Sequence, residues 1–452
     1  MEIFGHTRYE YIYYDNKNFK HNNAPVTRNH YANSRFVIDG NFKVKIDDYF
    51  FGLLNLEYDN YDISGRTDNW RGLNGGNAAA GASNSGWGKD NDLDVKQVFL
   101  GYMPHSSTTI TAGRQSVGSF FSNNIIGTGA KITNTSITGL NLKVSAYDTL
   151  QKTASIGSGL NGGVSSKSGV KPIQNNFYDS SIIGKYGFLT LGGYFSYLEN
   201  IFAMSAVDVA TKFNINKDFS FGLHGQYAFN NVDGWFKDDS FSRVDDANFW
   251  GIDANTRIFG FSFKTGFVKY SAKEGKMGFS AIEDESELVN PLYEAGGNEY
   301  TTTYQQNTIL TGGTVNPIIY ILPTGTYTNS LNPLEDAINY TLYSGNNQYW
   351  FVGGSYSFSG KFSIGHTYTR TTNKEPSYFY NYLPLQGTNN KIQSHNYLTN
   401  LAYSHNKKIN FSAYWSYTDK KYIGDGYVMP TINKKEIVCK DMASQPDIIF
   451  RL

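Results

Sequence analysis

The stretch KINFSAYWSY, residues 408–417, alternates between two kinds of side chain along its whole length. Its apolar and aromatic members stand at every second position, and they are Ile409, Phe411, Ala413, Trp415 and Tyr417. Successive side chains of a strand point to opposite faces, so the polar residues between them share the other face. The apolar face meets protein core in a soluble sandwich and lipid in a membrane barrel.

The same alternation recurs along the chain. FSFGLHGQYAFN (219–230) and YWFVGGSYSFSG (349–360) each place large apolar residues on one face and mainly Gly, Ser and other polar residues on the other. Similar segments fill most of the chain outside its stretches rich in Gly, Asn and Ser, and no helix of three turns with an apolar stripe is evident. The sequence therefore predicts an all-β protein.

The connections between these segments predict a membrane barrel. Very short turns follow alternate strands, at 47–48, 104–107, 138–139, 187, 214–218, 259–260, 359–360 and 406–407. Mostly long linkers stand at the other end, at 16–29, 61–91, 151–176, 231–246, 273–346, 373–392 and 421–435, with shorter ones at 116–127 and 199–200. Short periplasmic turns and long extracellular loops are typical of transmembrane, antiparallel, up-and-down β-barrels of the outer membrane.

The strand count leaves the C-terminal tail to be explained. About seventeen strands are clear, and a bacterial single-chain barrel is expected to have an even number, about eighteen. We expect a barrel domain over 1–422 and an atypical tail over 423–452, which ends in KKEIVCKDMASQPDIIFRL. Within this tail, 447–452 is the only candidate for the last strand, because an open barrel would leave two unpaired edges in lipid.

Composition narrows the function classes. Tyr and Phe number 35 and 31, and the Tyr and Trp residues near strand ends suit the membrane–water interface. The net charge of zero gives no reason to expect nucleic acid as a partner. Cys439 is the single cysteine, so no disulfide forms within the chain. The start, MEIFGHTRYEYIYY, does not read as a signal peptide, so we expect this sequence to begin within or just before the first strand.

Four segments, in order along the chain, carry a resemblance to a known family. They are KQVFLGYMPHSSTTITAGRQ (96–115), GTGAKITNTSITGLNLKVSAYDTL (127–150), AIEDESEL with YEAGGNEYTT (281–302), and NKKINFSAYWSYTD (406–419). In these the chain resembles the campylobacter-type major outer-membrane protein porins. The resemblance implies a trimeric general diffusion porin of the Gram-negative outer membrane. It also implies a pore narrowed by an infolded loop and a calcium ion held by acidic side chains near the constriction.

Candidate pore and metal residues follow from the same comparison. Arg114 ends a strand just before 116–127, the best candidate for the infolded loop, and the resembling porins place a basic residue at the constriction; the alternative is an Arg at the membrane edge. Asp148 and the acidic run Glu283, Asp284, Glu285 match acidic family positions and carry the oxygen ligands that calcium prefers. A solvated acidic loop is the other interpretation of that run. The segment FFSNNIIGTG (120–129) lacks the family's Asp, which weakens the calcium prediction.

Catalytic motifs are absent from the sequence. It contains no GxSxG, HExxH or GxxxxGK[ST], and we interpret His224 as a lumen or surface residue rather than a general base. Lys and Arg residues that lie on strands could form a basic wall, namely Arg8, Arg35, Lys43, Lys45 and Lys131.

The leading function is therefore passive passage of ions and small hydrophilic solutes through a water-filled channel, with no required cofactor and no enzymatic step. Outer-membrane lipid and further copies of the chain are the expected partners. The alternatives are a surface adhesin that binds host molecules through 273–346, and an outer-membrane lipid hydrolase.

Overall fold

The computed structural model describes residues 1–16, 20–21, 24–25, 29–62, 91–121, 125–152, 176–200, 202–233, 245–271, 273, 287–288, 346–358, 360–374, 379–380, 383–384, 391–405, 410–423 and 447–451. These residues form strands joined by turns. Within them, no helix is both long enough and apolar enough to span a membrane.

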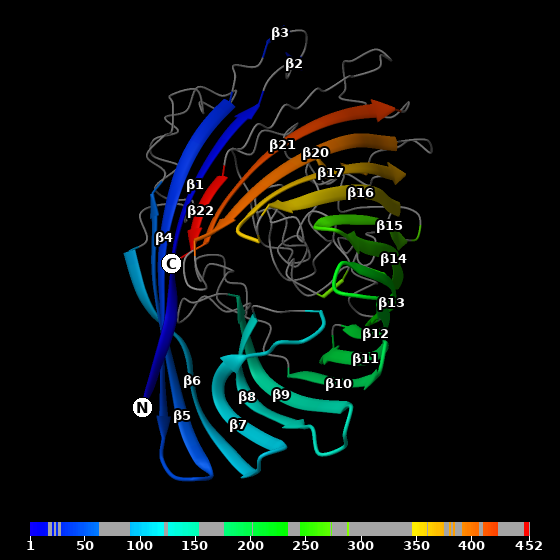
Figure 1. Cartoon of the computed structure of the whole chain (residues 1–452). Helices are drawn as coiled ribbons and strands as arrows, with labels where there is room; N and C mark the ends of the chain where they lie inside the picture. Colours follow the sequence, from blue (N-terminus) through cyan, green and yellow to red (C-terminus); the bar gives the residue numbers. More distant parts are fainter. Residues whose placement is uncertain are drawn as a thin grey trace.

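Eighteen strands form one antiparallel sheet that curls round on itself (Figure 1). Its first nine members in chain order are β1 (Glu2–Asn16), β4 (Asn29–Lys45), β5 (Phe50–Asp62), β6 (Asn91–His105), β7 (Thr108–Ser116), β8 (Ile125–Asn134), β9 (Leu140–Lys152), β10 (Phe177–Tyr186) and β11 (Leu189–Leu198). The other nine are β12 (Phe202–Asn214), β13 (Phe219–Val232), β14 (Ala247–Ile258), β15 (Phe261–Ser271), β16 (Asn346–Phe358), β17 (Phe362–Lys374), β20 (Lys391–Ser404), β21 (Asn410–Ile423) and β22 (Asp447–Arg451). Each strand pairs with the next one in this series, which is the predicted up-and-down order.

Four two-residue strands form two small hairpins beside the main sheet. β2 (Lys20–His21) pairs with β3 (Ala24–Pro25), and β18 (Phe379–Tyr380) pairs with β19 (Leu383–Pro384). They belong to the connections between β1 and β4 and between β17 and β20. Both connections are at the predicted long-loop end.

The eighteenth strand comes from the C-terminal tail. β22 lies between β21 and β1, as Figure 1 shows in red beside blue. It pairs with β21 through five residue pairs and with β1 through only two, Arg8 with Arg451 and Tyr9 with Phe450. The last strand is therefore formed by the residues that the sequence predicts for it. The pairing of β22 with β1 is the shortest strand pairing in the main sheet. The division of the chain at 422 stays a prediction.

The predicted short turns that lie within the described residues are observed at one end of the sheet. β10 and β11 are joined at Gly187, and β14 and β15 at Phe259 and Gly260. Gly187, Phe259 and Gly260 have φ values of 60°, 46° and 85°. Phe259 and Gly260 are consecutive residues with positive φ, and such a turn matches the twist of paired strands. The loop between β14 and β15 can therefore be as short as two residues.

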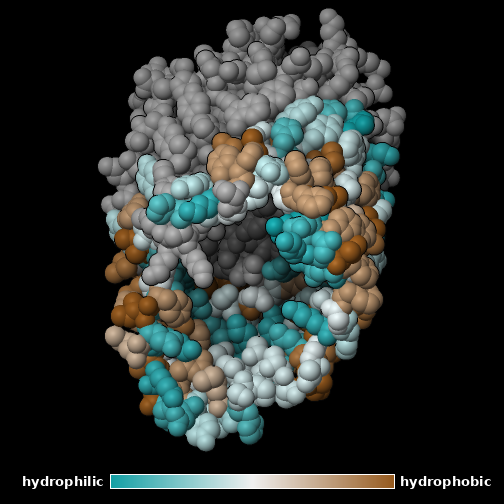
Figure 2. Space-filling model, viewed as in Figure 1, coloured by the Kyte–Doolittle hydropathy of each residue, from teal (hydrophilic) through white to brown (hydrophobic). Residues whose placement is uncertain are grey.

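The two faces of the sheet differ as the alternation predicts. On β13, Leu223, Tyr227 and Phe229 are between 44% and 49% exposed, whereas Gln226 and Asn230, which point to the opposite face, are 5% and 3% exposed. Large exposed apolar residues stand at alternate positions on many other strands, including Val207, Ile252 and Val352. Figure 2 shows hydrophobic residues along the flanks of the molecule and hydrophilic residues around the hollow. An apolar outer face and a polar inner face are the arrangement that lipid and a watery lumen require.

Residues 410–417 of the segment KINFSAYWSY belong to β21, whose backbone pairs with β20 and β22. Its side chains are outside those that the structure describes. Phe411 and Ala413 stand opposite Tyr403 and Leu401 in the register. Tyr403 and Leu401 are both exposed apolar residues.

Candidate functional site: the inner wall and its infolded segment

The chain turns into the barrel directly after β7. Val117, Phe120 and Phe121 are at most 4% exposed, and they belong to an apolar cluster with residues of the neighbouring inner wall such as Phe177 and Phe249. The sequence predicts that 116–127 fold inward, but β8 already begins at Ile125, so 117–121 are the described residues of this segment that lie outside strands. A segment buried against the inner wall reduces the open cross-section of a channel, so it is the candidate constriction.

Two lysines of the inner wall hold this segment through its backbone. Lys131 on β8 donates from Nζ to the carbonyl oxygen of Ser116 at 2.8 Å, and Lys143 on β9 donates to the carbonyl oxygen of Gly118. The backbone N–H of Ser116 donates in turn to Oε1 of Gln97 on β6 at 3.1 Å. These bonds tie the start of the segment to three strands.

Aromatic stacking and a second segment hold its far end. The ring of Phe120 stacks on Tyr194 of β11 with 4.1 Å between centroids. The backbone N–H of Glu287 donates to the carbonyl oxygen of Phe120 at 2.8 Å, and Leu288 is buried in the same apolar cluster. Residues from two connections, after β7 and after β15, therefore meet inside the barrel.

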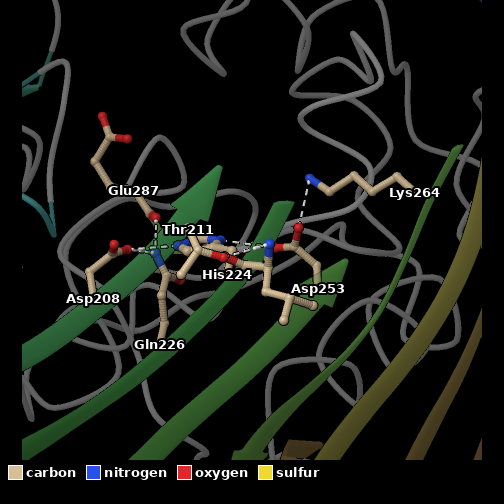
Figure 3. A network of polar contacts seen from close by, with 8 residues as sticks. Asp208, Thr211, His224, Gln226, Asp253, Lys264 and Glu287 are labelled. Atoms are coloured by element: carbon tan, nitrogen blue, oxygen red, sulfur yellow. Dashed lines mark hydrogen bonds and ion pairs between the residues drawn. The ribbon is translucent and has the colours of Figure 1, made fainter. Parts of the chain in front are cut away.

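A row of charged side chains crosses the inner face from β12 to β15 (Figure 3). His224 lies between two carboxylates, with Nε2 2.8 Å from Asp208 Oδ2 and Nδ1 2.9 Å from Asp253 Oδ2. Lys264 Nζ is 3.9 Å from Asp253 Oδ1. The register explains the row, because His224 stands directly opposite Asp253 and Ala210 stands opposite His224, two residues from Asp208.

Gln226 connects this row to the infolded residues. Its Nε2 donates to Asp208 Oδ2 at 2.6 Å and to the backbone carbonyl oxygen of Glu287 at 2.9 Å. Because the backbone of Glu287 also bonds Phe120, the charged row and the candidate constriction form one connected network.

A second charged group lies on β9, β10 and β11. Lys143 Nζ is 2.8 Å from Asp179 Oδ2, and the hydroxyl of Ser196 donates to Asp179 Oδ1 at 2.7 Å. The side chain of Asp179 is only 2% exposed. A carboxylate buried to this extent needs a cation and hydrogen-bond donors, and here it has both.

The predicted constriction residue Arg114 has a different environment from these lysines. It is partly buried, and its Nε donates to the carbonyl oxygen of Val95 at 3.1 Å. In the register it stands opposite Val98 and Thr128, which are both exposed. Its neighbour Gln115 is 1% exposed and bonds Thr111 and the backbone of Gly129. The assignment of Arg114 to the pore stays a prediction.

Of the three predicted calcium ligands, the structure describes only Asp148. Asp148 is exposed and lies where the pairing of β8 with β9 shifts register, and Glu283 and Asp284 are outside the described residues. Among those that the structure does describe, no group of three or more His, Cys, Asp and Glu is placed to hold a metal ion. The calcium site stays a prediction that rests on the resemblance.

Some residues of the lumen wall can be predicted from the sequence, but the ion pairs between its charged side chains cannot. Lys131 was expected on a basic wall, and it bonds the infolded segment, while Lys43 lies over the ring of Phe51 at 5.0 Å and Lys45 pairs with Asp48 in a turn. Asp208, Asp253 and Asp179 were not singled out. Their face could be read from the alternation, but their partners depend on the register between strands.

Comparison with known proteins agrees with this geometry. Residues 1–316 match the family described as Campylobacter major outer membrane protein. No curated protein sequence matches the chain. Similar solved structures include OpdL of Pseudomonas aeruginosa, with 11% identity, a TM-score of 0.56, and coverage of 100% of this chain and 98% of that chain.

Two further barrels of other bacteria are equally similar. OccAB2 of Acinetobacter baumannii has 11% identity and a TM-score of 0.57, and the match covers 99% of this chain and 96% of that chain. A BenF-like porin of Pseudomonas fluorescens has 11% identity and a TM-score of 0.56, covering 100% of this chain and 98% of that chain. At this identity the likeness concerns the fold.

An apolar outer face, a polar inner face and an infolded segment define an outer-membrane porin, which is a channel for small solutes. The family match extends over most of the chain and confirms this prediction. The chain belongs to the Campylobacter major outer membrane protein family.

Proposed function

We propose that the protein is a general diffusion porin that lets ions and small hydrophilic solutes pass down their concentration gradients. The proposal rests on the infolded segment 117–121, which lysine side chains of the inner wall hold inside the barrel. The outer face of the same barrel is apolar. Sieving by this segment and the field of the nearby charges would select solutes, with no covalent step.

Conductance of the refolded protein tests the proposal. In a planar lipid bilayer we expect discrete current steps that rise linearly with voltage. Liposome swelling should fall steeply with solute size among uncharged sugars. Folded protein, verified by its heat-dependent shift in detergent gels, that gives no current steps would contradict the channel function but not the barrel.

We also infer that three copies assemble in the membrane, as the resemblance to the family implies. Chemical cross-linking in detergent should give a ladder that ends at three chains, and the current should rise in groups of three equal steps. Single steps with only monomers on the gel would contradict the assembly and leave the channel in place.

Calcium is the remaining family property that we propose for this chain, with Asp148, Glu283 and Asp284 as ligands. Their carboxylates suit a hard cation, and all three lie in segments that carry the resemblance. Removal of calcium with a chelator should lower the melting temperature of the wild type, and Asp148→Asn should abolish that difference. Equal melting temperatures with and without calcium would contradict the site.

The alternative from the enzyme class is a lipid hydrolase, and we infer that the channel has no such activity. Incubation of folded protein with phospholipid vesicles should release no fatty acid above a heat-denatured control. Release that follows the amount of folded protein would contradict this inference.

A further inference from the structure

A hollow of about 450 Å³ opens on the inner wall where β1, β4, β5 and β6 meet the start of the infolded segment. Its lining includes Phe4, His6, Asp39, Asn55, Lys96 and Ser116. The register places His6, Asp39 and Glu57 side by side across three strands. The hollow is far along the wall from the charged row of β12 to β15.

One acceptor in this hollow has no donor. Asn55 is 2% exposed, and its amide Nδ2 donates to Asp39 Oδ1 at 2.9 Å and to Asn41 Oδ1 at 3.0 Å. No donor within the described residues reaches Asn55 Oδ1. The two bonds of Nδ2 fix the orientation of the amide, because a flip would turn Oδ1 toward the Asp39 carboxylate. A buried acceptor without a donor costs free energy, so the amide keeps this orientation for its two Nδ2 bonds, one of which positions the Asp39 carboxylate beside the hollow.

The charges around the hollow also favour a cation. Lys96 pairs with Glu57, its Nζ 2.5 Å from Oε2, so these two charges neutralise each other. Asp39 is 7% exposed and has two amide donors, from Asn41 and Asn55, while the ring of the exposed His6 is 4.0 Å away. Lys131 reaches the other side of the hollow, where it bonds the carbonyl oxygen of Ser116, so the negative charge is confined to the side at Asp39. Lys43, further along β4, lies over the ring of Phe51.

We propose that this hollow is a subsite for the protonated amine of a small solute on its way through the channel. The ammonium group would donate to the Asp39 carboxylate, since an ammonium has three donors and no acceptor. The aliphatic part of the solute would lie against Phe4 and Ile126, which also line the hollow. The inference rests on the proposed channel function and names a class of solute for it.

Block of the potassium current by small probes tests the subsite. Butylammonium, 1-butanol and butyrate have the same carbon chain and differ in the polar group. Butylammonium should reduce the single-channel current with a saturating concentration dependence, and the other two should not at equal concentration. Asp39→Asn should raise the half-blocking concentration about tenfold or more, because it removes the charge from a charge-assisted hydrogen bond.

His6→Lys provides a second test at an exposed position, where the chain should still fold. It places a fixed positive charge beside Asp39 and should raise the half-blocking concentration to a similar extent. The matched controls are Asp218→Asn and His405→Lys, which make the same substitutions in a turn and at an exposed position just after β20. Both controls should block like the wild type.

Each outcome bears on one proposal. The subsite would be overturned if the channels conduct but butylammonium does not reduce their current. It would also be overturned if butylammonium still reduces the current equally well in both Asp39→Asn and His6→Lys. Either result would leave the porin function intact. If Asp39→Asn does not fold, His6→Lys decides. Absence of any current from folded wild type would instead overturn the channel function.

Discussion

Lys143→Met is expected to destabilise the barrel and loosen its constriction together. The ammonium of Lys143 is 2.8 Å from Asp179 and also bonds the carbonyl oxygen of Gly118 in the infolded segment. Methionine has a similar length but carries neither charge nor donor. The variant therefore leaves Asp179 without this cation and releases one of the two lysine anchors of the segment.

The magnitude follows from the burial of Asp179. Its side chain is 2% exposed and keeps only the hydroxyl of Ser196, at 2.7 Å, as a donor that the structure gives apart from Lys143. Removal of one partner of a buried ion pair costs about 3 kcal/mol or more. This corresponds to roughly a hundredfold change in the unfolding equilibrium.

Urea unfolding in lipid vesicles, followed by tryptophan fluorescence, measures the loss. The double variant Lys143→Met with Asp179→Asn should recover at least about half of it, because the uncompensated charge is gone. Lys185→Met is the matched control, since Lys185 is exposed near the turn after β10. In bilayers, Lys143→Met should also conduct more than Lys185→Met.

Two results would refute this reasoning. A free energy of unfolding for Lys143→Met within about 0.5 kcal/mol of the Lys185→Met control would show that the pair is too hydrated to matter. A double variant no more stable than Lys143→Met would show that the loss does not come from the buried charge of Asp179.

Three further predictions concern the infolded segment, the predicted constriction residue and the last strand. Phe120→Ala removes a buried ring stacked on Tyr194, so it should lower the free energy of unfolding by about 3 kcal/mol and raise the conductance, and an unchanged conductance would remove Phe120 from the constriction. For Arg114→Glu, the resemblance predicts a shift toward cation preference. The position of Arg114 opposite the exposed Val98 instead predicts no shift, and the reversal potential in a salt gradient decides between the two. Deletion of 447–452 leaves β21 and β1 without β22, so no heat-shifting folded band should form; a stable folded band would show that β22 is dispensable.

The fold was largely predictable because each prediction depended on local pattern. Alternation over 219–230 defines which residues of β13 face outward, and short turns such as Gly187 define where hairpins reverse. Even the short β22 was found by elimination, since no other part of the tail could close the ring. These features need no knowledge of which residues meet across strands.

The candidate site was less predictable because its contacts depend on register and on inward-folding loops. His224 was placed on the polar face, but its position between Asp208 and Asp253 depends on pairings among three strands. The register between two paired strands cannot be predicted from the sequence of either strand alone. Register shifts at Asn55 and Thr128 change the alignment again near the hollow and near Asp148.

The join between β22 and β1 sets the order in which this molecule can be made. Tyr9 pairs with Phe450, so the wall closes only after almost the whole chain has been synthesised. Contacts between such distant residues form slowly, because a very long loop must be closed before they contribute any stability. Until then the chain's unpaired strand edges and apolar side chains stay exposed, and both make a chain prone to aggregate.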